Sequence, residues 1–116
     1  MKKEISFNEA IDLVKRIIRR FEKIEGKPWG VEGTMIELSK QVGELSKLIM
    51  VYEEYYFLDI SKLDKQYEAT KKKIADELAD IFYAVIRLAD YYDIDLLKAH
   101  LEARKEEDKF LKSKGV

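Results

Sequence analysis

The chain has 116 residues, a length suited to one domain with its own hydrophobic core. Lys and Arg total 22 and Asp and Glu total 23, so the net charge of -1 gives no bulk attraction to nucleic acid or to an anionic membrane. The chain has no Cys, which excludes disulfides and thiolate chemistry, and its single His argues against a His-rich zinc site. Any bound metal is therefore expected to have oxygen ligands.

The composition favours helices throughout. Gly occurs five times and Pro once, while Leu, Ile, Ala, Glu and Lys dominate, and strands and hairpins need more turn residues than this. We expect an all-α fold in which residues 1–116 form a single domain, a bundle-like protomer of four to five helices. No apolar run approaches the roughly 20 residues that a membrane span needs. A cytoplasmic protein with neither a membrane nor a nucleic-acid partner is expected.

The first helix has clear start and stop signals. Ser6 is followed three residues later by Glu9, which is the spacing of a capping box. Apolar residues then recur at steps of three and four, as on one face of a helix. Gly26 and Pro28 mark its end.

The second helix is predicted over 34–57, with Thr34 as its N-cap and Glu37 as the capping-box partner. Two neighbouring rows run along it. The apolar seam consists of Leu38, Val42, Leu45, Ile49, Tyr52 and Tyr56, and the bordering row of Glu37, Gln41, Glu44, Leu48, Val51 and Tyr55. The heptad-like seam predicts packing against a parallel or antiparallel helix. Gly43 in mid-helix is interpreted as permitting either a close helix crossing or access for a ligand.

The rest of the chain reads as a connection and two further helices. The polar segment 58–69 is a connection that can include a short helical turn. Thr70 is the expected cap of a third helix over 70–92, whose apolar residues cover about half of its circumference. Asp95 is the expected N-cap of the last helix.

Acidic residues lie near the start of the otherwise apolar third helix. Glu77 and Asp80 are three residues apart, so their side chains emerge on neighbouring rows of one helix face. Two carboxylates held that close repel each other, and a divalent cation between them would remove the repulsion. Asp76 is interpreted as interacting with the dipole at the helix N-terminus.

A second set of polar side chains completes the candidate site. If the second and third helices pack side by side, Glu44, with Gln41 or Glu37, faces the acids of the third helix. Mg²⁺ or Mn²⁺ binds such oxygen ligands and keeps several waters, which triphosphate oxygens can replace. The metal would neutralise phosphate charge and activate a water, with a carboxylate as a candidate base.

Simpler interpretations stand beside this one. The acids can be solvated helix surface, and capping of the second helix alone would explain Glu37. Arg87 lies about two turns beyond Asp80 on the third helix, where an ion pair and a phosphate contact are both compatible with its position.

Several segments together resemble the MazG-like nucleotide pyrophosphohydrolases, a group within the all-α NTP pyrophosphatases. QVGEL at 41–45 is similar to one conserved helix of that family, and DELADIFY at 76–83 to the other, with RLAD at 87–90 and IDL at 94–96 after it. The likeness covers residues from about Met35 to Leu101. The combination is more specific than either short motif alone.

The resemblance implies Mg²⁺-dependent cleavage of a nucleoside triphosphate between the α and β phosphates, giving a monophosphate and pyrophosphate. It also implies a homodimer or homotetramer whose nucleotide pocket includes residues of a second chain. By position, Glu44, Glu77 and Asp80 match metal-binding acids of the family, and replacing Glu44 or Glu77 is expected to abolish turnover. Where the family has Glu, this chain has Lys40 and Gln41. Gln41 offers a carbonyl oxygen without a charge.

Two further expectations follow. Basic residues of the C-terminal segment, Arg104 and Lys105, are candidate phosphate contacts together with Arg87, although Arg104 and Asp108 match the family's K-x-x-x-N motif only loosely. The alternative function is a non-catalytic helical module for nucleotide binding or assembly, in which Gln41 has weakened the metal site. That alternative predicts binding without hydrolysis.

Overall fold

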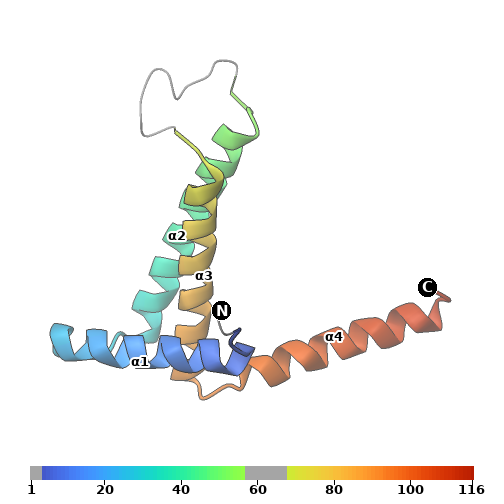
Figure 1. Ribbon diagram of the computed structural model, residues 1–116, viewed down its shortest axis with the longest axis horizontal. Helices are drawn as coiled ribbons and strands as arrows, with labels where there is room; N and C mark the ends of the chain where they lie inside the picture. Colours follow the sequence, from blue (N-terminus) through green and yellow to red (C-terminus); the bar gives the residue numbers. More distant parts are fainter. Residues whose placement is uncertain (1–3, 57–67) are drawn as a thin grey trace. The chain divides into compact units, whose positions relative to one another are not determined.

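The computed structural model describes residues 4–56 and 68–116. Within these ranges the chain forms four helices and no strand: α1 (Phe7–Glu25), α2 (Val31–Tyr52), α3 (Lys71–Tyr91) and α4 (Leu96–Ser113) (Figure 1). The predicted all-α fold is confirmed. Most of the predicted connection, including its short helical turn, lies outside the described residues.

The predicted boundaries of α1 are confirmed. The Ser6 hydroxyl accepts a hydrogen bond from the Glu9 amide at 3.1 Å, and the Glu9 carboxylate accepts one from the Ser6 amide at 3.4 Å. Gly26 takes a left-handed conformation with φ of 80°, which glycine adopts without steric cost, and its amide donates to the carbonyl of Glu22. Local cap chemistry thus sets both ends of the helix.

The two later helix starts are also confirmed. The Thr70 hydroxyl accepts from the amide of Lys73 at 3.1 Å, and α3 begins one residue after this threonine. The Asp95 carboxylate accepts from the amide of Lys98 at 3.0 Å and caps α4.

The predicted start of α2 at Thr34 is wrong. Gly30 is the N-cap, and Thr34 is a buried residue of the first turn of the helix whose hydroxyl donates to the Gly30 carbonyl at 3.2 Å. A threonine hydroxyl bonds to a backbone carbonyl four residues back within a helix as readily as it caps one, so the spacing of Thr34 and Glu37 did not identify the end. Glu37 therefore has no capping role.

The predicted end of α2 is also too late. The helix ends at Tyr52, and Glu54 has a positive φ of 58°, so Tyr56, the last residue of the predicted seam, lies beyond it. Residues 53–56, which follow the helix, contain no Gly or Pro to mark this end.

The chain divides into two compact units, with the boundary inside α3. The first unit combines Met1–Pro28 with Ile86–Val116, and the second is Trp29–Val85. The prediction of a single domain stays a prediction.

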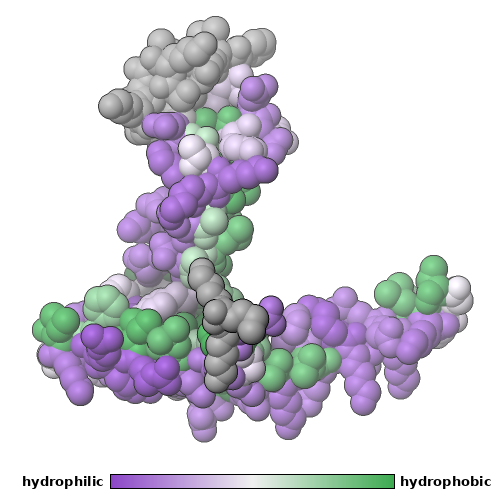
Figure 2. Space-filling model, in the orientation of Figure 1, coloured by the Kyte–Doolittle hydropathy of each residue, from purple (hydrophilic) through white to green (hydrophobic). Residues whose placement is uncertain are grey.

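The first unit contains α1, the end of α3, and α4. Its buried residues are Ile11 and Ile18 of α1 and Ile86 and Ala89 of α3. The Arg19 guanidinium donates to the Asp90 carboxylate at 2.9 Å, which joins α1 to α3. Figure 2 shows apolar surface along α1 beside hydrophilic surface, so part of the apolar face of α1 is not covered.

The second unit is built by α2 and the larger part of α3, which lie side by side in antiparallel directions (Figure 1). The predicted seam of α2 is only partly correct. Leu38 and Leu45 are half-buried, but Val42 and Ile49 are 46% and 41% exposed. Half-buried Gln41 and Leu48, from the bordering row, belong to the packed side instead.

Gly43 does not lie at a close helix crossing. A Cβ atom added to Gly43 would meet nothing within 4 Å in the described part of the chain, apart from the adjoining residues and backbone of its own helix. That half of the prediction is wrong for the described residues. The glycine leaves open space beside Glu44, which is itself exposed.

The α2–α3 pair has two chemically different flanks. Glu44 and Asp80 both act electrostatically on Glu77, so the acids of the two helices lie on one flank. By helical rotation, exposed apolar residues of both helices emerge on the other side of the packed faces. We call this the apolar flank, formed by Met35, Val42, Ile49, Leu78 and Phe82. The acidic flank comprises Glu37, Lys40, Glu44, Glu77 and Asp80.

Candidate functional site

The structure brings Glu44 of α2 and Glu77 of α3 together. Burial raises the pKa of Glu77, and the charge of Glu44 together with a hydrogen bond between the two carboxyl groups raises it further. The nearby charge of Asp80 acts in the same direction, whereas Lys40 lowers the pKa of Glu77. Two acids predicted from separate helices are therefore neighbours, with a third acid close by.

Glu44 lies close enough to Glu77 that its charge and its hydrogen bond favour the protonated form of the Glu77 carboxyl. A hydrogen bond between two carboxyl groups requires that one of them is protonated and donates to the other. Losing that proton leaves two negative charges side by side, which is unfavourable without a cation. A nearby cation would offset the repulsion that raises the pKa of Glu77.

Two buried side-chain oxygens, one on α2 and one on α3, have no hydrogen-bond partner within the described ranges. They are Oε2 of Glu77 and Oε1 of Gln41. Gln41 is oriented by its amide nitrogen, which donates to Oε1 of Glu37 at 3.2 Å. Buried acceptors without a donor are costly, and a cation or a donor placed between the helices would satisfy them.

Glu37 belongs to the acidic flank through these side-chain contacts. It accepts from Gln41, and its Oε1 lies 3.9 Å from Nζ of Lys40. Since Glu37 does not cap α2, its carboxylate is available to act with the other acids. Asp80 is exposed and contributes charge at the open side of the flank.

The donor set can be compared with what Mg²⁺ requires. Within residues 4–56 and 68–116, no three Asp, Glu or His side chains are grouped closely enough to hold a metal ion by themselves. Mg²⁺ commonly uses one or two carboxylates, keeps several waters and takes its remaining ligands from substrate phosphates. Glu44 and Glu77, with the neutral oxygen of Gln41, fit that mode of binding. The wider predicted ligand set, with Glu37 and Asp80, stays a prediction.

The predicted phosphate-contacting residues lie in the other compact unit. Arg87 follows Asp80 by seven residues on α3, and Arg104 and Lys105 are on α4. The Arg104 guanidinium pairs with Glu107 and lies 3.5 Å from Nδ1 of His100. Their roles toward a substrate stay predictions.

Lys40 is a member of the acidic flank that the sequence interpretation treated only as a departure from the family. It is three residues after Glu37 and four before Glu44, a spacing that places all three on one side of α2. That spacing was a usable signal. The positive charge of Lys40 acts on Glu77 of the neighbouring helix and lowers the pKa of Glu77.

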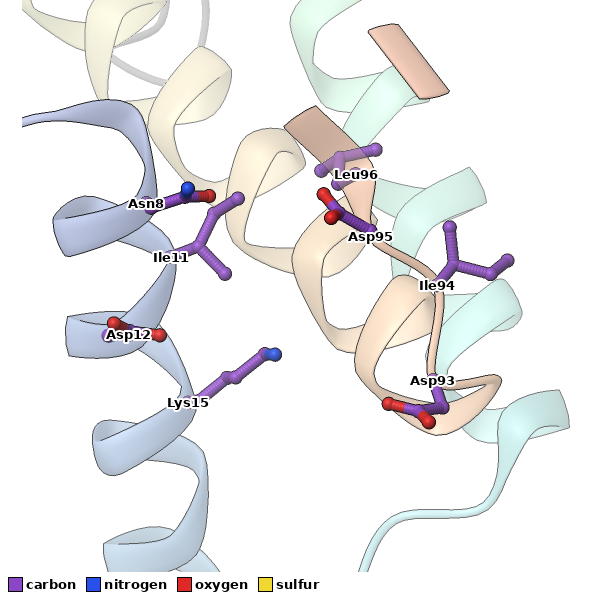
Figure 3. A pocket seen from close by; sticks show the side chains of 8 residues that line it. All are labelled: Asn8, Ile11, Asp12, Lys15, Asp93, Ile94, Asp95 and Leu96. Carbon is purple, nitrogen blue, oxygen red and sulfur yellow. The ribbon is translucent and has the colours of Figure 1, made fainter. Parts of the chain in front are cut away.

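A separate concavity of about 260 Å³ lies within the first unit. Asn8, Asp12 and Lys15 of α1 line one side, and Asp93 and Asp95 of the turn before α4 line the other (Figure 3). Figure 3 shows the Lys15 side chain extending toward this turn. None of the predicted site residues lines the concavity.

Comparison of the chain with protein-family models, with curated proteins and with solved structures gave no match. None of the four described helices combines the length and the apolarity of a membrane-crossing segment.

Proposed function

We propose that the chain is a Mg²⁺-dependent nucleoside triphosphate pyrophosphohydrolase, which cleaves the bond between the α and β phosphates to give a nucleoside monophosphate and pyrophosphate. Mn²⁺ is a candidate replacement for Mg²⁺. The observation that carries the proposal is the Glu44–Glu77 pair, with its raised Glu77 pKa and its adjacent buried oxygens. The resemblance to the MazG-like family supplies the reaction.

Residues of the acidic flank have distinct roles in the proposed reaction. A bound Mg²⁺ would neutralise phosphate charge and lower the pKa of a water. Ionised Glu44 and Glu77 would hold the cation, and Gln41 would offer an uncharged oxygen. Asp80 is exposed, and a triphosphate and the attacking water would approach the site from its side. Glu44 and Glu77 are also the candidate bases for that water.

We also propose that the chain assembles as a homodimer or homotetramer. The apolar flank supports this proposal, because Met35, Val42 and Ile49 are exposed at seven-residue intervals, as at a helix–helix interface. A Val42→Lys variant is expected to have a lower mass by light scattering than the native protein. Leu101→Lys, a matched change of an exposed leucine on α4, is the control.

The second candidate function is a non-catalytic nucleotide-binding or assembly module. It is favoured by Gln41 at a position where the family has an acid, and by the lack of a ready three-acid group in the described part of the chain. This function predicts that a triphosphate binds and is released unchanged.

A product assay tests the first function against the second. The protein is incubated with a panel of NTPs and dNTPs plus Mg²⁺, and released pyrophosphate is measured. Glu44→Ala and Glu77→Ala are expected to lose turnover, while Glu32→Ala, which removes an exposed acid from the start of α2, retains it. Folded native protein that releases no pyrophosphate from any nucleotide contradicts the enzyme. Binding of a non-hydrolysable triphosphate in that case supports the module.

A further inference from the structure

Lys40 is the one basic residue that belongs to the acidic flank as defined above. Its Nζ lies 3.9 Å from Oε1 of Glu37, and its side chain is 60% exposed. It also counteracts the effect of the surrounding carboxylates on Glu77. The ammonium group therefore lies beside the candidate metal ligands and still reaches solvent.

The ion pair with Glu37 does not fix this ammonium group. The distance is near the upper limit for an ion pair, and solvent-exposed ion pairs contribute little to stability. Lysine has a flexible four-carbon stem and three N–H donors, which suits it to bind phosphate oxygens as a compact charge. Lys40 can exchange Glu37 for a phosphate at little cost.

A lysine at this position works against metal binding, because its positive charge repels a divalent cation held by Glu44 and Glu77. Its presence is useful when the ligand is itself highly anionic. A polyphosphate approaching four carboxyl groups needs more positive charge than one divalent cation supplies, and Lys40 adds to it.

We propose that Lys40 is a phosphate-binding residue of this site, which contacts one phosphate of a phosphoanhydride chain beside the position where Glu44 and Glu77 would hold a divalent cation. The inference rests on the proposed function. It predicts that the site prefers ligands with at least two linked phosphates, because a single phosphate reaches both Lys40 and the cation position less easily.

Removing the lysine has opposite effects on the two ligands. In Lys40→Ala, Mg²⁺ alone binds more tightly, because a repulsive charge is gone, and pyrophosphate binds more weakly in saturating Mg²⁺. Each change is expected to be about fivefold, the effect of one unit charge at roughly 4 Å in a solvated site. Lys40→Arg keeps the charge and is expected to restore most of the pyrophosphate affinity. A lysine that only pairs with Glu37 would not produce opposite shifts.

Calorimetry measures both affinities without any turnover. MgCl₂ alone, and then inorganic pyrophosphate in saturating Mg²⁺, are titrated into native protein, Lys40→Ala, Lys40→Arg and a Lys71→Ala control. Lys71 is an exposed residue of α3, about half a turn around the helix from Asp80. Circular dichroism verifies that each variant is folded.

The outcomes separate this inference from the proposed function. Tighter Mg²⁺ binding with weaker pyrophosphate binding, in Lys40→Ala only, supports it. If the native protein binds both ligands and Lys40→Ala binds pyrophosphate equally well, Lys40 is not a phosphate contact and the proposed function stands. If the folded native protein binds neither Mg²⁺ nor pyrophosphate, the inference and the proposed function are both overturned.

Discussion

Replacing Glu77 by Gln should stabilise the metal-free protein at neutral pH. The pKa of Glu77 is raised by burial and by Glu44, so folding favours the protonated form. The stability from that protonated form is fully present below the unfolded-state pKa of about 4.3, and it is lost as the pH rises through the higher folded-state pKa. Gln is uncharged at every pH and has nearly the same shape. Glu77→Gln therefore removes a repulsion that exists only at the higher pH.

The expected gain is modest because Glu44 is exposed and Glu77 is only half-buried. Two unit charges about 4 Å apart in a well-solvated site repel by about 1 kcal/mol, which corresponds to roughly 4 °C in Tm for a chain of this length. Thermal unfolding in EDTA should show this gain at pH 7 and a progressively smaller difference as the pH falls below about 4, where protonation of Glu77 removes the repulsion.

In Mg²⁺, the native protein should be more stable than Glu77→Gln, the reverse of the order expected without metal. At 100 times its dissociation constant, a ligand of the folded state adds about 2.7 kcal/mol, and Glu77→Gln should lose most of this gain. Asp76→Asn is the control, because Asp76 is the neighbouring acid on α3 and pairs with Lys72 at 2.8 Å on the exposed side. A Glu77→Gln variant that is less stable than native protein at pH 7 without metal, or that gains as much from Mg²⁺, would refute the reasoning.

Three further predictions concern the fold. Ser6→Ala should lower the free energy of unfolding in urea by about 1 kcal/mol, since it removes the α1 cap; an unchanged midpoint would contradict the capping box. Thr34→Val should change stability by less than about 0.5 kcal/mol, because the Gly30 carbonyl keeps its bond from the residue 34 amide; a loss of about 1 kcal/mol would indicate a capping role instead. Asp90→Ala should cost about 0.5–1 kcal/mol, less at high salt, through loss of the pair with the 53% exposed Arg19; a salt-independent cost would argue against it.

The sequence predicted the local features of the fold more accurately than the non-local ones. The caps at Ser6, Thr70 and Asp95 were identified because a cap depends on residues within one turn. Thr34 was misassigned because the same residue type forms a similar bond inside a helix. Local hydrogen-bond chemistry alone does not separate these two cases.

The packing of α2 shows why the remainder could not be predicted. A heptad pattern identifies rows of apolar residues but does not say which row the neighbouring helix covers. Leu45 lies on the packed side, whereas Val42, from the same predicted seam, is exposed. Gly43 was interpreted as permitting either a close helix crossing or access for a ligand. Whether a crossing occurs there also depends on the neighbouring helix, and the space beside Gly43 proved open.

In the candidate site, too, the features set by local spacing were predicted, and those that depend on helix packing were predicted only in part. Glu77 and Asp80 were grouped by their spacing on one helix, and Glu44 was added by assuming that two helices pack side by side, which they do. Lys40 was not recognised as a member, because a basic residue does not fit the pattern expected of metal ligands. Its relation to Glu77 depends on the approach of α2 to α3.

The central claim is that the Glu44–Glu77 pair enables Mg²⁺-dependent cleavage between the α and β phosphates. The most direct test is ³¹P NMR of a nucleoside triphosphate incubated with the protein and Mg²⁺, beside a Glu44→Gln variant. The native protein should produce pyrophosphate and nucleoside monophosphate in equal amounts, and the variant neither. Unchanged triphosphate with the folded native protein, release of orthophosphate and nucleoside diphosphate, or full activity of Glu44→Gln would contradict the claim.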